Sequence, residues 1–182
     1  MTEQQNIPAT IPANGSTILP EGYQPIFHQG FNAWVGPIFG NFDGPDMGPH
    51  HFVFDVRPEH LNGGGMLHGG MMMTLADVVL GSTVANAVGG MGSTIALNCD
   101  FLAGIKPGTR VEGEATVSRL TRSVAFVSGR LFSGDRTFLT ASGIWKISPK
   151  APDEARTDFR VGSQVNMNEF TSERALESYM LD

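Results

Sequence analysis

Apolar residues follow one another almost without interruption over residues 66–88, which predicts a helix that is buried on nearly every side. The stretch comes directly after a glycine-rich turn at residues 60–70, so we expect the helix to begin at Gly69 or Gly70. Asp77 is the only residue within it that is certain to be charged. Because an ionised carboxylate on a buried helix is costly unless it is paired or hydrogen-bonded, Asp77 needs a partner or a chemical role.

Segments with the pattern of β-strands precede and follow this helix in the sequence. Residues 50–57 alternate, with Phe52, Phe54 and Val56 on one face, and the segments 93–103, 110–120, 123–133 and 136–147 are also typical of strands. Short connections at 121–122 and 134–135 predict tight hairpins and an antiparallel meander. Only a curled sheet can cover the circumference of one long apolar helix, so we predict an α+β fold with an antiparallel sheet wrapped around it.

The remaining chain is assigned by composition and spacing. Apolar spacing over residues 23–39 predicts a short amphipathic helix, limited by Gly30 and Pro37, and 39–49 is typical of a loop or hairpin turn. We divide the chain into an N-terminal arm (1–20), one domain (21–148) and a C-terminal extension (149–182) with a short helix over 169–179.

Composition narrows the classes of function. The 182 residues carry a net charge of -6, without the basic excess that nucleic acid or an anionic membrane would require. The glycines and Asp77 favour a buried helix over a membrane span, and the single Cys99 favours a structural thiol in a cytoplasmic protein. His50 and His51 point to opposite faces of one strand, so we expect no metal site.

The predicted start of the helix suits an anionic or polarised ligand. A helix that begins at Gly69 has N–H groups without intrahelical partners, and the helix dipole adds to their positive potential. Two glycines let a carbonyl oxygen approach the backbone closely, as an oxyanion site requires. The glycines are equally compatible with a tight connection between strand and helix.

Asp77 follows Gly69 by eight residues, which places the two about 12 Å apart along one helix. If Gly69 binds a carbonyl and Asp77 drives attack on it, the two must come from central helices of different subunits, most simply in a two-fold dimer. The alternative is an Asp77 held in the core by Ser82, Thr74 or a backbone group.

The pattern Asn62-x-x-Gly65-x-x-His68-Gly69-Gly70, followed by Leu75-Ala76-Asp77, resembles the motif of hotdog-fold acyl-CoA thioesterases of the phenylacetic-acid-degradation type. The resemblance spans about residues 51–147. It implies that the Gly69 amide polarises the thioester carbonyl with help from Asn62. It also implies that Asp77 of the opposite subunit is either a general base toward water or a nucleophile that forms a transient anhydride.

The same resemblance extends to further positions. A hydroxyl at Thr94, or alternatively Ser93, would help to hold the water, and His68 would position the loop, although an acid–base role stays open for it. Basic and polar residues near the hairpin between the second and third strands after the helix would contact coenzyme A, and this region contains Arg119, Arg122 and Ser123. The remaining candidates for substrate binding are Gly70 and Met66.

The resemblance therefore implies an enzyme that hydrolyses acyl-CoA thioesters to a carboxylic acid and free coenzyme A. No cofactor is expected, since coenzyme A belongs to the substrate, and the expected partner is a second copy, as a homodimer or as a homotetramer of two dimers. Met71, Met72 and Met73 would give an adaptable pocket wall. The alternatives are a hotdog enoyl-CoA hydratase or dehydratase, a non-catalytic acyl-CoA or aromatic-acid binding protein, and a purely structural oligomer.

Overall fold

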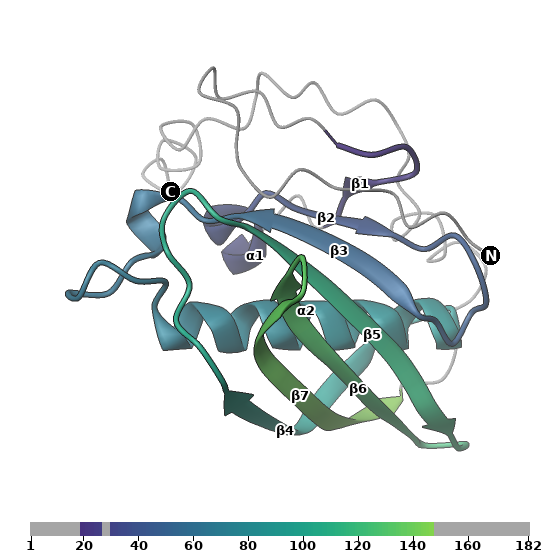
Figure 1. Cartoon of the computed structure of the whole chain (residues 1–182). Helices are drawn as coiled ribbons and strands as arrows, with labels where there is room; N and C mark the ends of the chain where they lie inside the picture. The colour runs from purple at the N-terminus through teal and green to yellow at the C-terminus, as the bar shows by residue number, and fades with distance from the viewer. Residues whose placement is uncertain (1–18, 27–29, 148–182) are drawn as a thin grey trace, which may run out of the picture.

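A single seven-stranded sheet curls around one long helix in the computed structural model, which describes residues 19–26 and 30–147 (Figure 1). The elements are β1 (Gln24–Pro25), α1 (Gly30–Val35), β2 (Ile38–Asn41), β3 (His50–Asp55), the 3-10 helix η1 (Pro58–His60), α2 (Gly69–Val88), β4 (Gly92–Phe101), β5 (Arg110–Leu120), β6 (Val124–Ser133) and β7 (Arg136–Ile147). The predicted arm up to residue 18 and the whole predicted extension after 148, with its helix, lie outside the described residues.

α2 forms the centre of the fold and confirms the predicted helix. It begins at Gly69 and ends at Gly89, whose positive φ of 62° closes the last turn as a left-handed cap. Its length and composition would also suit a membrane span, but most of its side chains are buried by the sheet. The helix approaches the sheet closely where the strands carry glycine: a Cβ on Gly113 would lie 2.9 Å from Val79 Cγ2.

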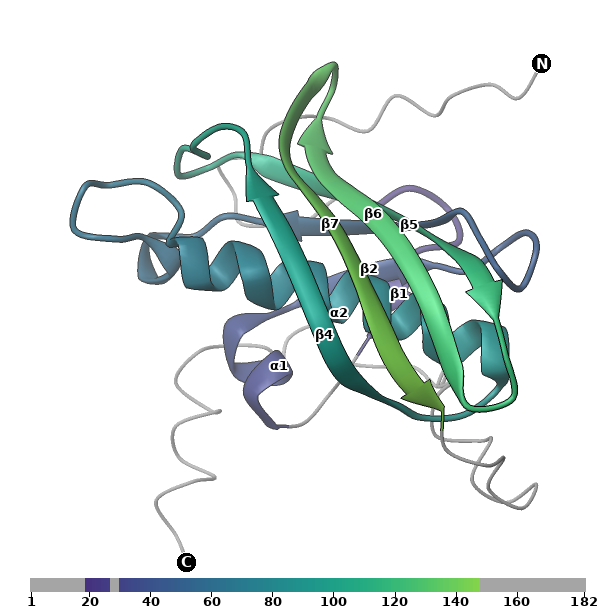
Figure 2. The same ribbon diagram turned by 90° about the horizontal axis from the view of Figure 1, so that it is seen from below.

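The strand order β1-β2-β3-β5-β6-β7-β4 corrects the predicted meander. β5, β6 and β7 pair in sequence, but β4 pairs with β7 at one edge and β5 pairs with β3. The connection from β4 to β5 does not form a hairpin, because it passes the start of α2, where Ile105 is fully buried and its carbonyl accepts the Leu67 N–H at 2.8 Å. Figure 2 shows β4 at the edge of the sheet, crossing α2 at an angle.

The segment 23–39 differs in part from its prediction. Among its described residues, Gly30–Val35 is helical, inside the limits expected from Gly30 and Pro37, whereas Ile38 and Phe39 pair with Phe54 and Val53 as strand β2, and this pairing overrides the helical spacing. Phe31 and Trp34, expected to pack, are each 58% exposed. β3 is also covered on both faces rather than one, since Val53 is as buried as Phe52.

Candidate active site

The first turn of α2 leaves the backbone N–H of Gly69 open. His68 is the N-cap residue, and its Nδ1 accepts the Gly70 N–H at 2.9 Å, while its carbonyl accepts the Met72 N–H at 3.1 Å. Among the described residues the Gly69 N–H has no acceptor. The amide therefore keeps the hydrogen-bonding capacity that an oxyanion site needs, at the positive end of the helix dipole.

His68 has a positional task in this geometry. A nitrogen that accepts a hydrogen bond carries no proton, so Nδ1 is committed to the cap and only Nε2 can bear the ring proton. Gly70 makes the cap possible, since a Cβ there would lie 3.0 Å from His68 Nδ1. The arrangement favours the positional role over the acid–base role.

Asn62 organises the loop that leads to the helix. Its Oδ1 accepts the N–H groups of Gly64 at 2.8 Å and Met66 at 3.3 Å, and its backbone N–H donates to the Met66 carbonyl at 2.8 Å. Gly65 completes the turn with a positive φ of 76°. Since Oδ1 is occupied, the exposed Nδ2 amide is the part of Asn62 that can donate to a ligand.

Asp77 is half-buried on α2 and is held by the edge strand. The Thr94 hydroxyl donates to Asp77 Oδ1 at 2.8 Å. The other two candidates do not bond to Asp77: Thr74 donates to the Gly70 carbonyl, and the buried Ser82 hydroxyl has no partner among the described residues. Ser93, the alternative hydroxyl, is exposed and faces away from Thr94 in the alternating strand. Thr94 is therefore the hydroxyl that accompanies the acid.

β4 carries a bulge next to this contact. The register with β7 runs from Thr94 opposite Trp145 to Ala96 opposite Ile144, so Ile95 is an extra residue. Bulges of this kind redirect side chains near functional sites. One face of β4 lies toward α2, because its residues pair with buried residues of β7. The residues on this face, on either side of the bulge, are Thr94, Leu97, Cys99 and Phe101.

The predicted residues gather at two separate places on one chain. Asn62, His68, Gly69 and Gly70 lie at the start of α2, and Asp77 and Thr94 lie two helical turns further on, about 12 Å away. Met66 belongs to the first group, but its methyl packs toward Gly104, where an added Cβ would lie 2.8 Å from it. No single subunit brings Gly69 and Asp77 together.

The predicted coenzyme A residues lie at the far end of the sheet. Arg119 is the residue before the last in β5, and Arg122 and Ser123 lie in the β5–β6 hairpin, at the opposite end of the molecule from the start of α2 (Figures 1 and 2). Lys146, which the sequence analysis did not single out, is opposite Val124 and Ser93 in adjacent strands. This end is therefore next to Thr94 rather than Gly69.

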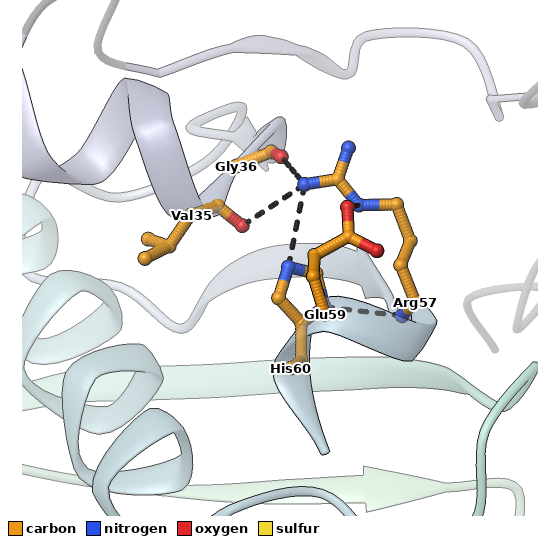
Figure 3. Close-up of polar contacts among 5 residues, drawn as sticks. All are labelled: Val35, Gly36, Arg57, Glu59 and His60. Atoms are coloured by element: carbon orange, nitrogen blue, oxygen red, sulfur yellow. Dashed lines mark hydrogen bonds and ion pairs between the residues drawn. The ribbon is translucent and has the colours of Figure 1, made fainter. Parts of the chain in front are cut away.

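A buried histidine joins the loop to α1, which the sequence analysis also missed. Figure 3 shows Arg57 reaching the carbonyls of Val35 and Gly36, with its backbone N–H donating to His60 Nδ1 at 3.0 Å and Glu59 pairing with its guanidinium at 3.1 Å. Burial, with the Arg57 charge as a second cause, lowers the pKa of His60 to about 4. The His60 carbonyl in turn accepts the His68 N–H at 2.9 Å, so this cluster supports the cap of α2.

Similarity to known proteins covers the region that contains these groups. A family model described as the thioesterase superfamily matches residues 64–139. A protein of Pseudomonas aeruginosa named as a candidate esterase is 34% identical over 134 residues, which are 71% of this chain and 97% of that protein. The matched family region includes Gly69, Asp77 and Thr94.

Solved structures give the same picture of the fold. A phenylacetic acid degradation-related protein from Ralstonia eutropha is similar with a TM-score of 0.52 and 26% identity, covering 59% of this chain and 84% of that one. A thioesterase-type protein from Streptococcus pneumoniae, solved with coenzyme A, has a TM-score of 0.53 and 18% identity, covering 57% and 83%. The hotdog arrangement of one helix within an antiparallel sheet is common to them and to this chain.

Proposed function

Since the chain belongs to the thioesterase superfamily, we propose that it hydrolyses acyl-CoA thioesters to a carboxylic acid and free coenzyme A. The observation that carries the proposal is the open Gly69 N–H at the start of α2, with Asp77 two turns further along the same helix. The coenzyme A in the similar Streptococcus pneumoniae structure supports the choice of thioester.

The carbonyl of the thioester is assigned to the first group of residues. Its oxygen accepts the Gly69 N–H and the Asn62 Nδ2–H, both of which are free of other acceptors in the described structure. As water attacks the carbonyl carbon, negative charge grows on this oxygen, and such donors contribute about 3 kcal/mol to the transition state. The His68 cap and the Asn62 loop hold the two donors in place.

The attack itself is assigned to Asp77. As a general base, its carboxylate takes a proton from water while the water oxygen bonds to the carbonyl carbon; collapse of the tetrahedral intermediate then breaks the C–S bond, and the sulfur receives the proton. As a nucleophile, the carboxylate would bond to the carbon itself and expel the thiolate, and water would then cleave the anhydride. In a single turnover in oxygen-18 water, an unlabelled first acid identifies the nucleophilic route, because its oxygen comes from Asp77 when water attacks the Asp77 carbon of the anhydride.

The two groups of residues meet only between subunits in this proposal. The separation of about 12 Å along α2 exceeds the reach of a carboxylate, so Gly69 of one copy is completed by Asp77 of another. β4 is an edge strand with Ile95 58% exposed, and Met91 just before it is equally exposed. These features favour a two-fold homodimer with paired central helices, and two dimers can assemble into a homotetramer.

Coenzyme A is assigned to the end of the sheet beside Thr94. Arg119, Arg122 and Lys146 are exposed there, and within the described part of the chain none has an acidic partner at ion-pair distance. Three unpaired cations at one corner of an acidic protein suit the phosphates of the substrate. Coenzyme A enters as part of the substrate, so the proposal requires no separate cofactor.

The decisive experiment is thiol release from a panel of aliphatic and aryl acyl-CoA substrates, measured for wild type and Asp77→Asn. We expect wild-type turnover on part of the panel and a loss of at least about a hundredfold in the variant, with unchanged circular dichroism. Turnover that survives Asp77→Asn would contradict the mechanism. Tight binding without any turnover by wild type would instead favour a non-catalytic binding protein, and enoyl-CoA hydration would favour a hydratase.

The shared site is tested by mixing two inactive chains. Gly69→Ala adds a methyl beside the amide, and its Cβ would lie 3.7 Å from Phe101, an ordinary contact that the fold tolerates. Co-expression of Gly69→Ala with Asp77→Asn gives mixed dimers with one intact site, so about a quarter of wild-type activity should return. Equal amounts of either variant alone serve as the control, and no recovery in the mixture would refute a site shared between subunits.

A further inference from the structure

The three consecutive methionines of α2 have different surroundings. Met71 and Met72 are buried in the core, Met72 with only 3% of its surface exposed, whereas Met73 is 42% exposed. Residues four apart on a helix lie on one face, so Gly69, Met73 and Asp77 form a single stripe along α2. Met73 therefore stands midway between the oxyanion donor of one proposed site and the Asp77 that the same subunit would contribute to the other site.

β4 runs alongside this stripe with its own apolar side chains. At one end Thr94 bonds to Asp77, and at the other the Phe101 ring lies next to Gly69, with Cε1 3.7 Å from the position of an added Cβ. Leu97 and Cys99 lie between them on the same face. The pKa of Cys99 is raised by burial and further by the charges of Asp100 and Asp77.

We name Met73, Leu97, Cys99 and Phe101 the apolar strip. It extends from the Gly69 amide toward Asp77, and its four side chains carry neither charge nor amide. Phe101 is 51% exposed and lies beside Gly69, so its ring is accessible to a ligand bound at the Gly69 amide.

We propose that the apolar strip binds the acyl chain, that Met73 and Phe101 set its preferred length, and that the enzyme therefore prefers uncharged apolar acyl groups. This inference rests on the proposed thioesterase function. A chain whose carbonyl oxygen is bound at Gly69 begins against Phe101 and extends along Met73. An acyl group that ends in a carboxylate finds no partner on the strip, so its burial there is unfavourable. The flexible thioether of Met73 lets the site accept chains of neighbouring length.

The test compares kcat/KM for butanoyl-, hexanoyl-, octanoyl-, decanoyl- and succinyl-CoA among wild type, Met73→Ala, Met73→Phe and Phe101→Ala. Each methylene that gains or loses a contact in an apolar site changes kcat/KM by about tenfold or more. Met73→Ala should shift the preference toward longer chains by about that factor, and Met73→Phe should shift it toward shorter ones. Wild type should disfavour succinyl-CoA against butanoyl-CoA by a similar factor.

Met47→Ala is the matched control. Met47 is also partly exposed, at 37%, but it lies in the loop between β2 and β3, where its carbonyl accepts the Val117 N–H, away from α2's first turn. We expect this variant to keep the wild-type order of substrates. Size-exclusion chromatography of each variant accompanies the assay, because a side chain between subunits would alter assembly.

Three results would overturn the inference. An unchanged order of substrates in all three strip variants, or equal turnover of succinyl- and butanoyl-CoA by wild type, removes the strip from acyl recognition and leaves the hydrolase intact. An equal loss on every substrate together with a change in oligomeric size assigns Met73 to the subunit interface. A wild type that neither cleaves nor binds any of the substrates removes the proposed function as well.

Discussion

Replacement of His68 separates a structural role from a catalytic one at the centre of the site. Its Nδ1 accepts the Gly70 N–H, and its backbone carbonyl begins the hydrogen bonding of α2. Alanine keeps the second of these interactions and removes the first. Asparagine restores a side-chain acceptor of the kind most favoured at an N-cap, but it cannot transfer protons as an imidazole does.

The magnitudes follow from the surroundings of the cap. Loss of an N-cap acceptor costs about 1 kcal/mol, and water can reach the released Gly70 N–H because this contact is exposed. We therefore expect His68→Ala to lower the free energy of unfolding by about 1 kcal/mol, and His68→Asn to change it by a few tenths. With the cap restored, His68→Asn should keep kcat/KM within about threefold of wild type, because the Gly69 donor stays in place.

The assay pairs urea unfolding at one fixed protein concentration with acyl-CoA turnover, since the stability of an oligomer depends on concentration. A positional His68 predicts that activity follows the cap: retained in His68→Asn and reduced in His68→Ala. If both variants are folded and both lose about a hundredfold or more in kcat, His68 transfers protons and the positional interpretation is wrong.

Three further predictions address the acid, the buried histidine and the basic corner. Thr94→Val removes the hydroxyl donor 2.8 Å from Asp77 Oδ1, and because Asp77 is half-buried we expect kcat to fall by about tenfold. Thr94→Ser should restore kcat, whereas full kcat in Thr94→Val would contradict a role for the hydroxyl. The fold holds His60 unprotonated by lowering its pKa from 6.5 to about 4, so the unfolded chain binds more protons in that interval and stability is lost as the pH falls from 6.5 toward 4, by up to about 3 kcal/mol. Urea unfolding at pH 6.5 and 4.5 should show a smaller decline in His60→Gln than in wild type, and identical declines would refute this. Lys146→Gln should raise KM for acyl-CoA by about two- to fivefold at low salt without changing kcat, whereas Arg136→Gln, at the β6–β7 hairpin, should not; equal effects of the two would argue against a phosphate site at Lys146.

The fold was largely predictable where one pattern decided it. α2 is apolar over its whole circumference and is ended by a glycine, so its position followed from composition alone. Pairing was harder to predict, because alternation tells which residues are strands but not which strands are neighbours. β4 pairs with β7 rather than with β5. The segment between β4 and β5 packs against the start of α2, where Ile105 is fully buried, and this tertiary contact has no local signal in the sequence.

Some residues of the candidate site could also be predicted from the sequence, and others could not. Gly69 and Asp77 were conspicuous as a glycine turn and a lone carboxylate, but Thr94 was identified only through a family resemblance, and the bulge that precedes Ala96 has no sequence signature. Phe101 and Lys146 were missed because an aromatic and a lysine on a strand are ordinary residues until the register shows their neighbours. Strand β2 (Ile38–Asn41) was missed because helical spacing and strand pairing compete for the same residues.

The edge position of β4 exposes a single subunit to aggregation. An uncovered edge strand presents unpaired backbone N–H and C=O groups to any other strand, and here Ile95 and Phe101 add exposed apolar surface beside them. In the proposed dimer, a subunit that has not yet met a second copy would therefore be a template for aggregation. Assembly would cover this edge at the same moment that it completes the site.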